Sequence, residues 1–329
     1  MNLRKLISEN RLAVFGRLLP SMWREYWRFA DANARCKNSR MSEKRLTDIL
    51  MTTHALEKAL SLPNLRKSFG LKKAQGLIKN IQYYIDNYGF SDQLIVPISI
   101  LKIYINYHKN NNVWSGDLKK IEENLIKIIE ESGRSIESYN MAGSFVRTRE
   151  DLEKTAHSDF KEMALNRFSI RNFSNEEISE TLIDEAISIA KKSPSACNRQ
   201  SYRVHVYKGE NKNRILEIQG GANGFYKNAN TLFIITADLN RYYLKEIHLG
   251  FVDASLFAMS LIYSLTYLGI GSIPLTLGIG SSKLDEIQRG FGIPQNEIPV
   301  ILIAAGHYAD NLNVAMSTRN SNETFVTKH

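Results

Sequence analysis

Residues 167–200 read RFSIRNFSNEEISETLIDEAISIAKKSPSACNRQ, and the second half of the chain can be interpreted from this stretch outward. Arg167, Ser169 and Arg171 stand at alternate positions, so an extended segment would place their side chains on one side. Guanidinium groups suit phosphate, because each planar fork of donors meets two phosphate oxygens at once. An amphipathic helix follows, and the polar turn 194–200 then leads into a strand. The stretch therefore predicts a phosphate contact beside a turn whose polar groups suit a flat heteroaromatic ring.

The helix inside this stretch has a start signal and a stop signal. Ser174 and Glu177 have the spacing of a capping box, and Ser193–Pro194 ends the helix because proline cannot continue it. The apolar residues between them recur at helical spacing and predict one buried face, formed by Ile178, Leu182, Ala186, Ile189 and Ala190.

Further strands and helices are predicted after this stretch. Alternation over Arg203–Tyr207 predicts one strand, and the continuous apolar run Thr231–Ala237 predicts a strand covered on both faces. A long apolar helix is expected from about Gly250 to Leu268, packed on the sheet or on a second subunit. The remaining elements are two short strands at 270–275 and 298–306, and a helix at 282–291 with Ser282 and Asp285 at capping-box spacing.

Charge is distributed unevenly along the chain. The 329 residues carry a formal net charge of +9. Residues 1–75 contain 16 Lys and Arg against 6 Asp and Glu, whereas residues 151–329 contain 18 against 19. An acidic partner or a membrane surface is therefore expected to meet the first 75 residues. No nucleic-acid partner is expected.

Residues 1–38 mix aromatic and apolar residues with arginines. One interpretation is a pair of basic amphipathic helices, broken at Pro20, that lies on an acidic membrane surface. The other is an aromatic face packed on the rest of the protein. The second is favoured, because aromatic stripes at helical spacing usually lie in a core.

Helical spacing continues through the rest of the first half, over residues 42–62, 71–105 and 118–129. The segment THALEKAL places His54, Glu57 and Lys58 on a helix face that is either a binding surface or, as favoured, solvated. The polar residues 133–158 are the expected boundary. The chain is therefore predicted to contain a basic all-helical module of unknown role at 1–150 and a second domain at 159–329.

Cysteine usage and hydropathy predict a cytoplasmic protein. Cys36 and Cys197 form no disulfide framework and no metal-ligand pattern, and Cys197 is expected to be a small buried residue rather than a redox thiol. Charged residues between Arg4 and Arg17 interrupt any signal-peptide core. The apolar stretch 251–268 is too polar for a confident membrane span. Peripheral association with the inner face of the membrane is the alternative location.

Five segments, in this order, resemble the nitroreductase family of flavin-dependent reductases: Arg167–Arg171, Pro194–Gln200, Leu268–Gly271, Ser272–Thr276 and Ser317–Arg319. The resemblance covers about residues 159–329. It implies an α+β fold, with a mixed sheet flanked by helices, in a homodimer that holds FMN at its interface. The helical segment before it is similar to the extension found in nitroreductase-like proteins of polysaccharide gene clusters.

The resemblance also implies roles for particular residues. The FMN phosphate and ribityl chain would contact Arg167, Ser169, Arg171 and Arg319. The flavin ring would contact the turn, expected to come from the partner subunit, and the end of a strand; these residues are Pro194, Ser195, Asn198 and Gln200, with Pro274, Leu275 and Thr276. No catalytic side chain is required, since the flavin itself carries hydride transfer. No metal is predicted.

The implied activity is ping-pong oxidoreduction. NAD(P)H would reduce FMN, which would then pass electrons to an electrophilic small molecule of the quinone, nitro or enone type. Thr276 and Leu277 stand where nitro-reducing members often have an acidic residue and a glycine, and Ser317 stands where lysine is common. These departures leave two alternatives open: other flavin chemistry, or a non-catalytic flavin-binding protein docked on an envelope-polysaccharide or membrane-bound assembly.

Overall fold

The computed structural model describes residues 10–32, 41–243 and 245–329. Contacts divide the chain into two compact units. The first unit comprises residues up to 60 together with 65–144 and 315–329, and the second comprises 61–64 and 145–314. The division at Ser144 lies within the polar segment 133–158. The C-terminal residues 315–329 belong to the first unit, although they follow the second unit in sequence.

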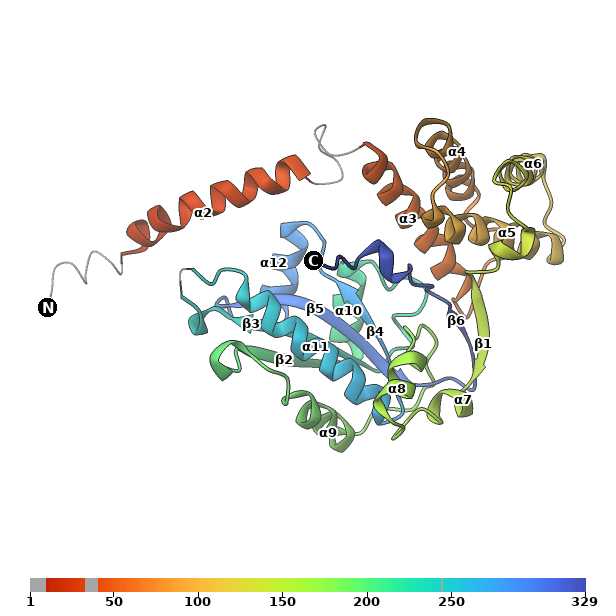
Figure 1. Ribbon diagram of the computed structural model, residues 1–329. Coiled ribbons are helices and arrows are strands. Elements are labelled where there is room, and N and C mark those ends of the chain that lie inside the picture. The colour runs from red at the N-terminus through yellow and green to blue at the C-terminus, as the bar shows by residue number, and fades with distance from the viewer. Residues whose placement is uncertain (1–9, 33–40, 244) are drawn as a thin grey trace, which may run out of the picture. The chain divides into compact units, whose positions relative to one another are not determined.

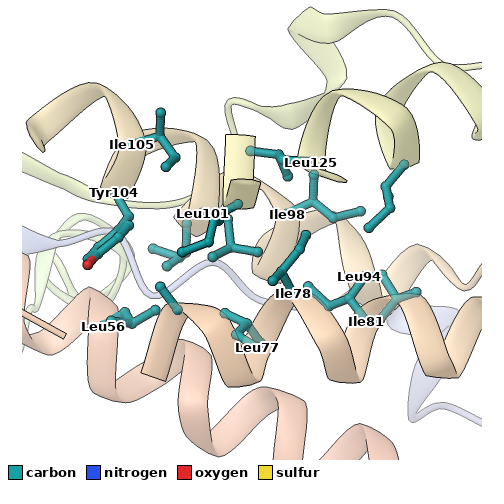
Figure 2. Close-up of a cluster of buried hydrophobic side chains, with 14 of the residues drawn as sticks. Leu56, Leu77, Ile78, Ile81, Leu94, Ile98, Leu101, Tyr104, Ile105 and Leu125 are labelled. Atoms are coloured by element: carbon teal, nitrogen blue, oxygen red, sulfur yellow. The ribbon is translucent and has the colours of Figure 1, made fainter. Parts of the chain in front are cut away.

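The first unit is built from helices. Its elements are α2 (Arg11–Ala32), α3 (Met41–Leu60), α4 (Leu71–Tyr88), η1 (Asp92–Leu94), α5 (Ile95–Asn110), α6 (Gly116–Glu131) and η2 (Ile136–Tyr139), with η5 (Asn322–Thr324) near the C-terminus. Helices α3 to α6 enclose one apolar core, part of which is shown in Figure 2. The helical spacing predicted over 71–105 is interrupted at Gly89, whose φ of 80° favours glycine and ends α4.

Helix α2 differs from its prediction in two ways. It is continuous, with Pro20 inside it (Figure 1), so the expected break at Pro20 is wrong. Its aromatic residues are exposed, including Phe15, Trp23 and Tyr26. The favoured interpretation of an aromatic face packed in a core is therefore wrong for the described residues of this segment. Residues 1–9 and 33–38 of the same prediction lie outside the described residues.

The second unit contains a four-stranded sheet in the order β2-β3-β5-β4. Its strands are β2 (Tyr202–Lys208), β3 (Thr231–Asp238), β5 (Glu297–His307) and β4 (Ile270–Thr276), and neighbouring strands pair antiparallel. One isolated parallel bridge joins Ser169 to Ser272 on β4. The short strands β1 (Ser144–Thr148) and β6 (Asn311–Ala315) form a separate two-stranded sheet.

Helices cover both faces of the four-stranded sheet (Figure 1). Leu232 and Ile234 of β3 pack in a cluster with α10 (Gly209–Gln219) and α12 (Ser281–Gly290). Phe233 and Ile235 pack on the other face with α9 (Glu180–Ala190) and α11 (Leu249–Tyr267). This alternation explains why β3 is buried along its whole length, as predicted. The α+β class is confirmed. The shorter helices are α7 (Arg149–Glu153), α8 (Phe160–Asn166), η3 (Ala196–Asn198) and η4 (Leu239–Arg241).

Two predicted capping boxes are wrong. Helix α9 begins at Glu180, and its N-cap is Ser179, whose side chain accepts a hydrogen bond from the Leu182 N–H. The Ser174 side chain instead accepts from the Glu176 N–H outside the helix. Helix α12 has Gly280 at its N-cap and no side-chain cap. Helix α10 was not predicted.

Helix α11 packs on the sheet through one face, which settles part of the choice left open by the sequence. Among the described helices it alone is long and apolar enough to cross a membrane by length and composition, yet 56% of its apolar window is buried. Its outer face exposes four apolar residues: Phe251, Val252, Leu256 and Met259. Helix α11 therefore has the burial of a core helix with an apolar outer face.

Candidate functional site

Residues Arg167–Arg171, called the arginine segment below, lie beside the edge strand β4. The Ile170 N–H donates to the Ser272 carbonyl at 3.0 Å, and the Ile170 side chain enters the core. Arg171 is only 5% exposed, and its guanidinium donates to Ser61 Oγ at 3.4 Å and to the Ser169 carbonyl at 3.3 Å. Arg167 and Ser169 are half-buried. The segment is thus fixed by backbone pairing and by one buried arginine.

The polar turn has an unusual backbone. Cys197, Asn198 and Gln200 all have positive φ, at 51°, 53° and 48°, a region that non-glycine residues seldom adopt. The Ser195 hydroxyl accepts from the Gln200 N–H at 2.9 Å, which closes the turn. Cys197 is exposed with a free thiol, so its expected burial is wrong. Pro194, Asn198 and Gln200 are exposed as well.

A buried carboxylate on α11 fixes the backbone of this turn. Asp253 of α11 is 2% exposed, and its Oδ1 accepts from the Ala196 N–H at 3.0 Å. Its Oδ2 accepts from Ser201 Oγ at 2.9 Å and from the Tyr242 hydroxyl at 2.8 Å. Burial raises the pKa of Tyr242 to about 12, and the hydrogen bond to Asp253 acts in the same direction. The Tyr242 hydroxyl therefore stays protonated and donates to Asp253 at neutral pH.

An ion pair also holds the backbone of the turn in place. Arg199 donates to both Glu246 oxygens, at 2.7 and 3.0 Å, and its Nε donates to the Ala196 carbonyl at 3.0 Å. The Arg199 guanidinium lies 5.1 Å from the centre of the Tyr242 ring. The hydrogen bond from Arg199 lowers the pKa of Glu246. Ala196 is thereby held at both its N–H and its carbonyl.

Sequence reasoning did not identify Asp253, Ser201, Tyr242, Arg199 or Glu246 as part of the site. One signal was available. Asp253 is the sole charged residue between Phe251 and Leu268, and a charge on an apolar helix needs a partner when buried. That partner cannot be identified from spacing, because Asp253 and Ala196 lie 57 residues apart.

The end of β4 carries the third group of predicted residues. Pro274, Leu275 and Thr276 pair with Ile303, Leu302 and Ile301 of β5. Leu275 is buried and Thr276 is exposed. The Thr276 carbonyl accepts from the Gln219 side-chain amide at 2.9 Å, which ties the end of α10 to the end of β4.

Arg319 belongs to the first unit. It is exposed, and its guanidinium donates to the Ser317 carbonyl. The Ser317 N–H, at a residue with φ of 47°, donates to Glu57 Oε1 at 3.2 Å. Glu57 is only 5% exposed, so its expected place on a solvated face is wrong. The contact of Arg319 with the cofactor stays a prediction.

The structure brings together only part of the predicted site within the second unit. The bridge between Ser169 and Ser272 places the arginine segment beside β4. The turn Pro194–Gln200 precedes β2, and β3 and β5 intervene between β2 and β4. With strands about 4.8 Å apart, β2 and β4 are separated by about 14 Å. The turn and the arginine segment therefore lie at opposite edges of the sheet.

A cleft of about 690 Å³ opens between α8, α9 and α11. Pro194 is the one predicted site residue in its lining, which also includes Glu185, Lys192, Ser260 and Tyr263. The cleft thus borders the turn at Pro194, and α11 lines it with Ser260, Tyr263, Ser264 and Tyr267.

Comparisons with known proteins agree with the resemblance. Residues 164–222 match the Nitroreductase family; they contain the arginine segment, α9, the turn and β2. The match covers part of the second unit, which is therefore similar to this family over those residues. The residues that match the family model end at 222, before Pro274, Leu275, Thr276 and Arg319.

Two curated relatives align with about half of the chain. A Methanothermobacter thermautotrophicus protein named NADH dehydrogenase/NAD(P)H nitroreductase is 28% identical over 174 residues, covering 50% of this chain and 88% of that protein. A Bacillus subtilis protein named FMN reductase (NAD(P)H) is 26% identical over 159 residues, covering 43% of this chain and 63% of that protein.

A solved nitroreductase-family protein from Streptococcus pneumoniae aligns over 52% of this chain and 100% of its own, at 20% identity and a TM-score of 0.44.

Proposed function

We propose that the second unit is an NAD(P)H-dependent oxidoreductase domain that uses FMN to reduce an electrophilic small molecule. One observation carries the proposal: the family-matched arginine segment is fixed beside β4 by the bridge between Ser169 and Ser272. The names of the two curated relatives support the electron donor and the flavin.

The side chains of the domain fit FMN chemically. Arg167 and Arg171 supply guanidinium donors for a phosphate dianion. Ser272, 2% exposed, has a hydroxyl with no hydrogen-bond partner among the described residues, and it lies beside Ser169. The turn offers the exposed amide side chains of Asn198 and Gln200, which suit the polar edge of a flat ring.

The residues of the chain would hold and orient the cofactor rather than react. FMN held here would supply the chemistry of hydride acceptance from NAD(P)H and electron transfer to a second substrate. Arg167, Ser169 and Arg171 would bind its phosphate end, and Pro274, Leu275 and Thr276 would lie against its ring. Donors near the flavin ring would stabilise negative charge on the reduced cofactor. A ping-pong order follows when the donor leaves before the acceptor binds.

The domain would work as a homodimer. The turn precedes β2 and the arginine segment lies beside β4, at opposite edges of the sheet, which favours a site shared between two copies. A second copy would supply Pro194, Ser195, Asn198 and Gln200 to the site formed by its partner. The exposed apolar residues on the outer face of α11 offer a surface for contact with a second copy.

Thr276 bears on the choice of acceptor. It is exposed at the end of β4, and it replaces the acidic residue often found in nitro-reducing members. A neutral side chain there would alter the contacts of a bound acceptor. We therefore place quinones and enones beside nitro compounds as the acceptor classes.

The experiment is spectroscopic. Purified protein is expected to be yellow, and anaerobic addition of NADH or NADPH is expected to bleach it. A colourless protein that FMN cannot reconstitute would refute the cofactor assignment. A yellow protein that neither donor bleaches would favour the alternative of a non-catalytic flavin-binding protein.

Peripheral docking is the second part of the proposal. The excess of basic residues lies in residues 1–75, and basic segments are attracted to acidic surfaces. The first unit would bring the oxidoreductase to a membrane surface or to an assembly on that surface.

A further inference from the structure

Helix α2 presents a continuous apolar stripe to solvent. Leu12, Phe15, Leu19, Met22 and Tyr26 follow one another at intervals of three or four residues, so they share one face of the helix. All five are exposed; Phe15 is 57% and Tyr26 63% exposed. A stripe of this size on a soluble surface marks a contact site.

Trp23 and Trp27 lie beside the stripe and form an aromatic cluster with Tyr26. The Trp23 and Trp27 ring centres lie 5.6 Å apart, and those of Tyr26 and Trp27 lie 5.7 Å apart. Trp23 is 59% and Trp27 47% exposed. Tryptophan and tyrosine favour the boundary between lipid headgroups and acyl chains, because their rings are apolar with one polar group.

Three of the four arginines of α2 occupy the opposite face, whereas Arg11, its first residue, lies on the side of the stripe. Arg17, Arg24 and Arg28 are separated by seven and four residues, which places them in one row on a helix with 3.6 residues per turn. All three are exposed. The row lies roughly opposite the apolar stripe, so the helix has separate cationic and apolar faces.

The charges determine how such a helix would meet a bilayer. Its 22 residues are about 33 Å long, which is enough to cross one. However, α2 contains four arginines, Glu25 and Asp31. Among the described helices, only α11 is both long enough and apolar enough to cross a membrane. A helix with these two faces lies in the plane of the membrane interface.

We propose that α2 binds anionic phospholipid bilayers, with Phe15, Trp23, Tyr26 and Trp27 inserted at the interface and its arginines beside the acidic headgroups. Anionic lipid is the occupant that complements both faces, because it offers apolar depth and negative charge together. This inference deepens the docking part of the proposed function and is independent of its flavin part.

The test uses the full-length protein and sedimentation with vesicles. Binding is expected to vesicles of equal parts phosphatidylglycerol and phosphatidylcholine, at least roughly tenfold more tightly than to phosphatidylcholine alone, and to weaken as salt rises. Replacing Trp23 and Trp27 with glutamine is expected to weaken binding by roughly tenfold or more. Trp114→Gln is the matched control, because Trp114 is also exposed but lies outside α2; it should bind like wild type.

Two outcomes would overturn the proposal. One is wild-type protein that stays in the supernatant with anionic vesicles. The other is equal binding by wild type and the double tryptophan variant. Sedimentation velocity without lipid tests whether α2 instead contacts a second copy of the chain. That alternative holds if wild type is a dimer, the double tryptophan variant is a monomer, and neither protein binds vesicles. Flavin content and bleaching, measured on the same samples, report on the oxidoreductase separately.

Discussion

The Ala196 N–H donates to Oδ1 of Asp253 at 3.0 Å, and this bond connects the turn of the candidate site to the helix that supports it. Three residues of that turn have positive φ, a conformation that costs free energy unless surrounding contacts maintain it. Asp253 also accepts hydrogen bonds from Ser201 and Tyr242. The carboxylate therefore holds the start and the end of the turn together.

Asp253→Asn should loosen the turn. Asparagine has one acceptor oxygen where aspartate has two, so either the Ala196 N–H or the hydroxyls of Ser201 and Tyr242 would face an NH2 group. A buried donor then loses its acceptor, at a cost of about 1–3 kcal/mol in the free energy of unfolding. We expect FMN to bind more weakly as well, measured by quenching of its fluorescence. Asp184→Asn is the control, because Asp184 is exposed on α9. Unchanged stability and unchanged FMN affinity would contradict the anchoring role.

The pair between Arg199 and Glu246 should make stability depend on pH. The hydrogen bond from Arg199 lowers the pKa of Glu246. The ionised carboxylate therefore adds to the free energy of unfolding above the ordinary glutamate pKa, and this stabilisation is lost as pH falls through the lowered pKa. Glu246→Gln should therefore destabilise the protein at neutral pH but have little effect in acid. Denaturant unfolding at the two pH values measures this, with the exposed Glu177→Gln as control. If wild type and Glu246→Gln differ in free energy of unfolding by the same amount at both pH values, the ion pair does not stabilise the fold.

Arg167→Gln should reduce the affinity for FMN. Removing a charge-assisted hydrogen bond to phosphate costs about 1.5–3 kcal/mol, or roughly ten- to a hundredfold in Kd. Arg167 is half-buried rather than buried, so the variant should fold, as circular dichroism can verify. Arg214→Gln is the matched control, since Arg214 is exposed and packs over Phe291. Equal affinity in both variants would remove Arg167 from the phosphate site.

Mixed dimers should separate the two halves of the site. One chain carries Arg167→Gln, and the other carries Asn198→Ala with Gln200→Ala. If each site combines the arginine segment of one chain with the turn of the other, a mixed dimer has one intact site and one doubly altered site. About half of the wild-type flavin content is expected, against little in either parent dimer. Mixed dimers as poor in flavin as their parents would show that each site lies within one chain.

Local patterns predicted much of the second unit. The run Thr231–Ala237 indicated a strand covered on both faces, and β3 is that strand. The long apolar helix expected from about Gly250 to Leu268 is α11, Leu249–Tyr267. The start of α9 was placed wrongly, because Ser174 and Ser179 are both capable N-caps and spacing alone does not choose between them. The structure has Ser179, whose hydroxyl accepts from Leu182.

The order of the five segments could be read from the sequence, and their resemblance to the nitroreductase family predicted the α+β class; apolar periodicity and residue type predicted the individual strands and helices. Only the tertiary structure decided which residues support the site. Asp253 meets Ala196 across 57 residues and Glu57 meets Ser317 across 260, and such contacts form when packing excludes water from distant polar groups that must then pair. Strand order likewise decided that Arg167–Arg171 and Pro194–Gln200 lie on opposite edges of one sheet, because pairing between strands is a property of the folded chain.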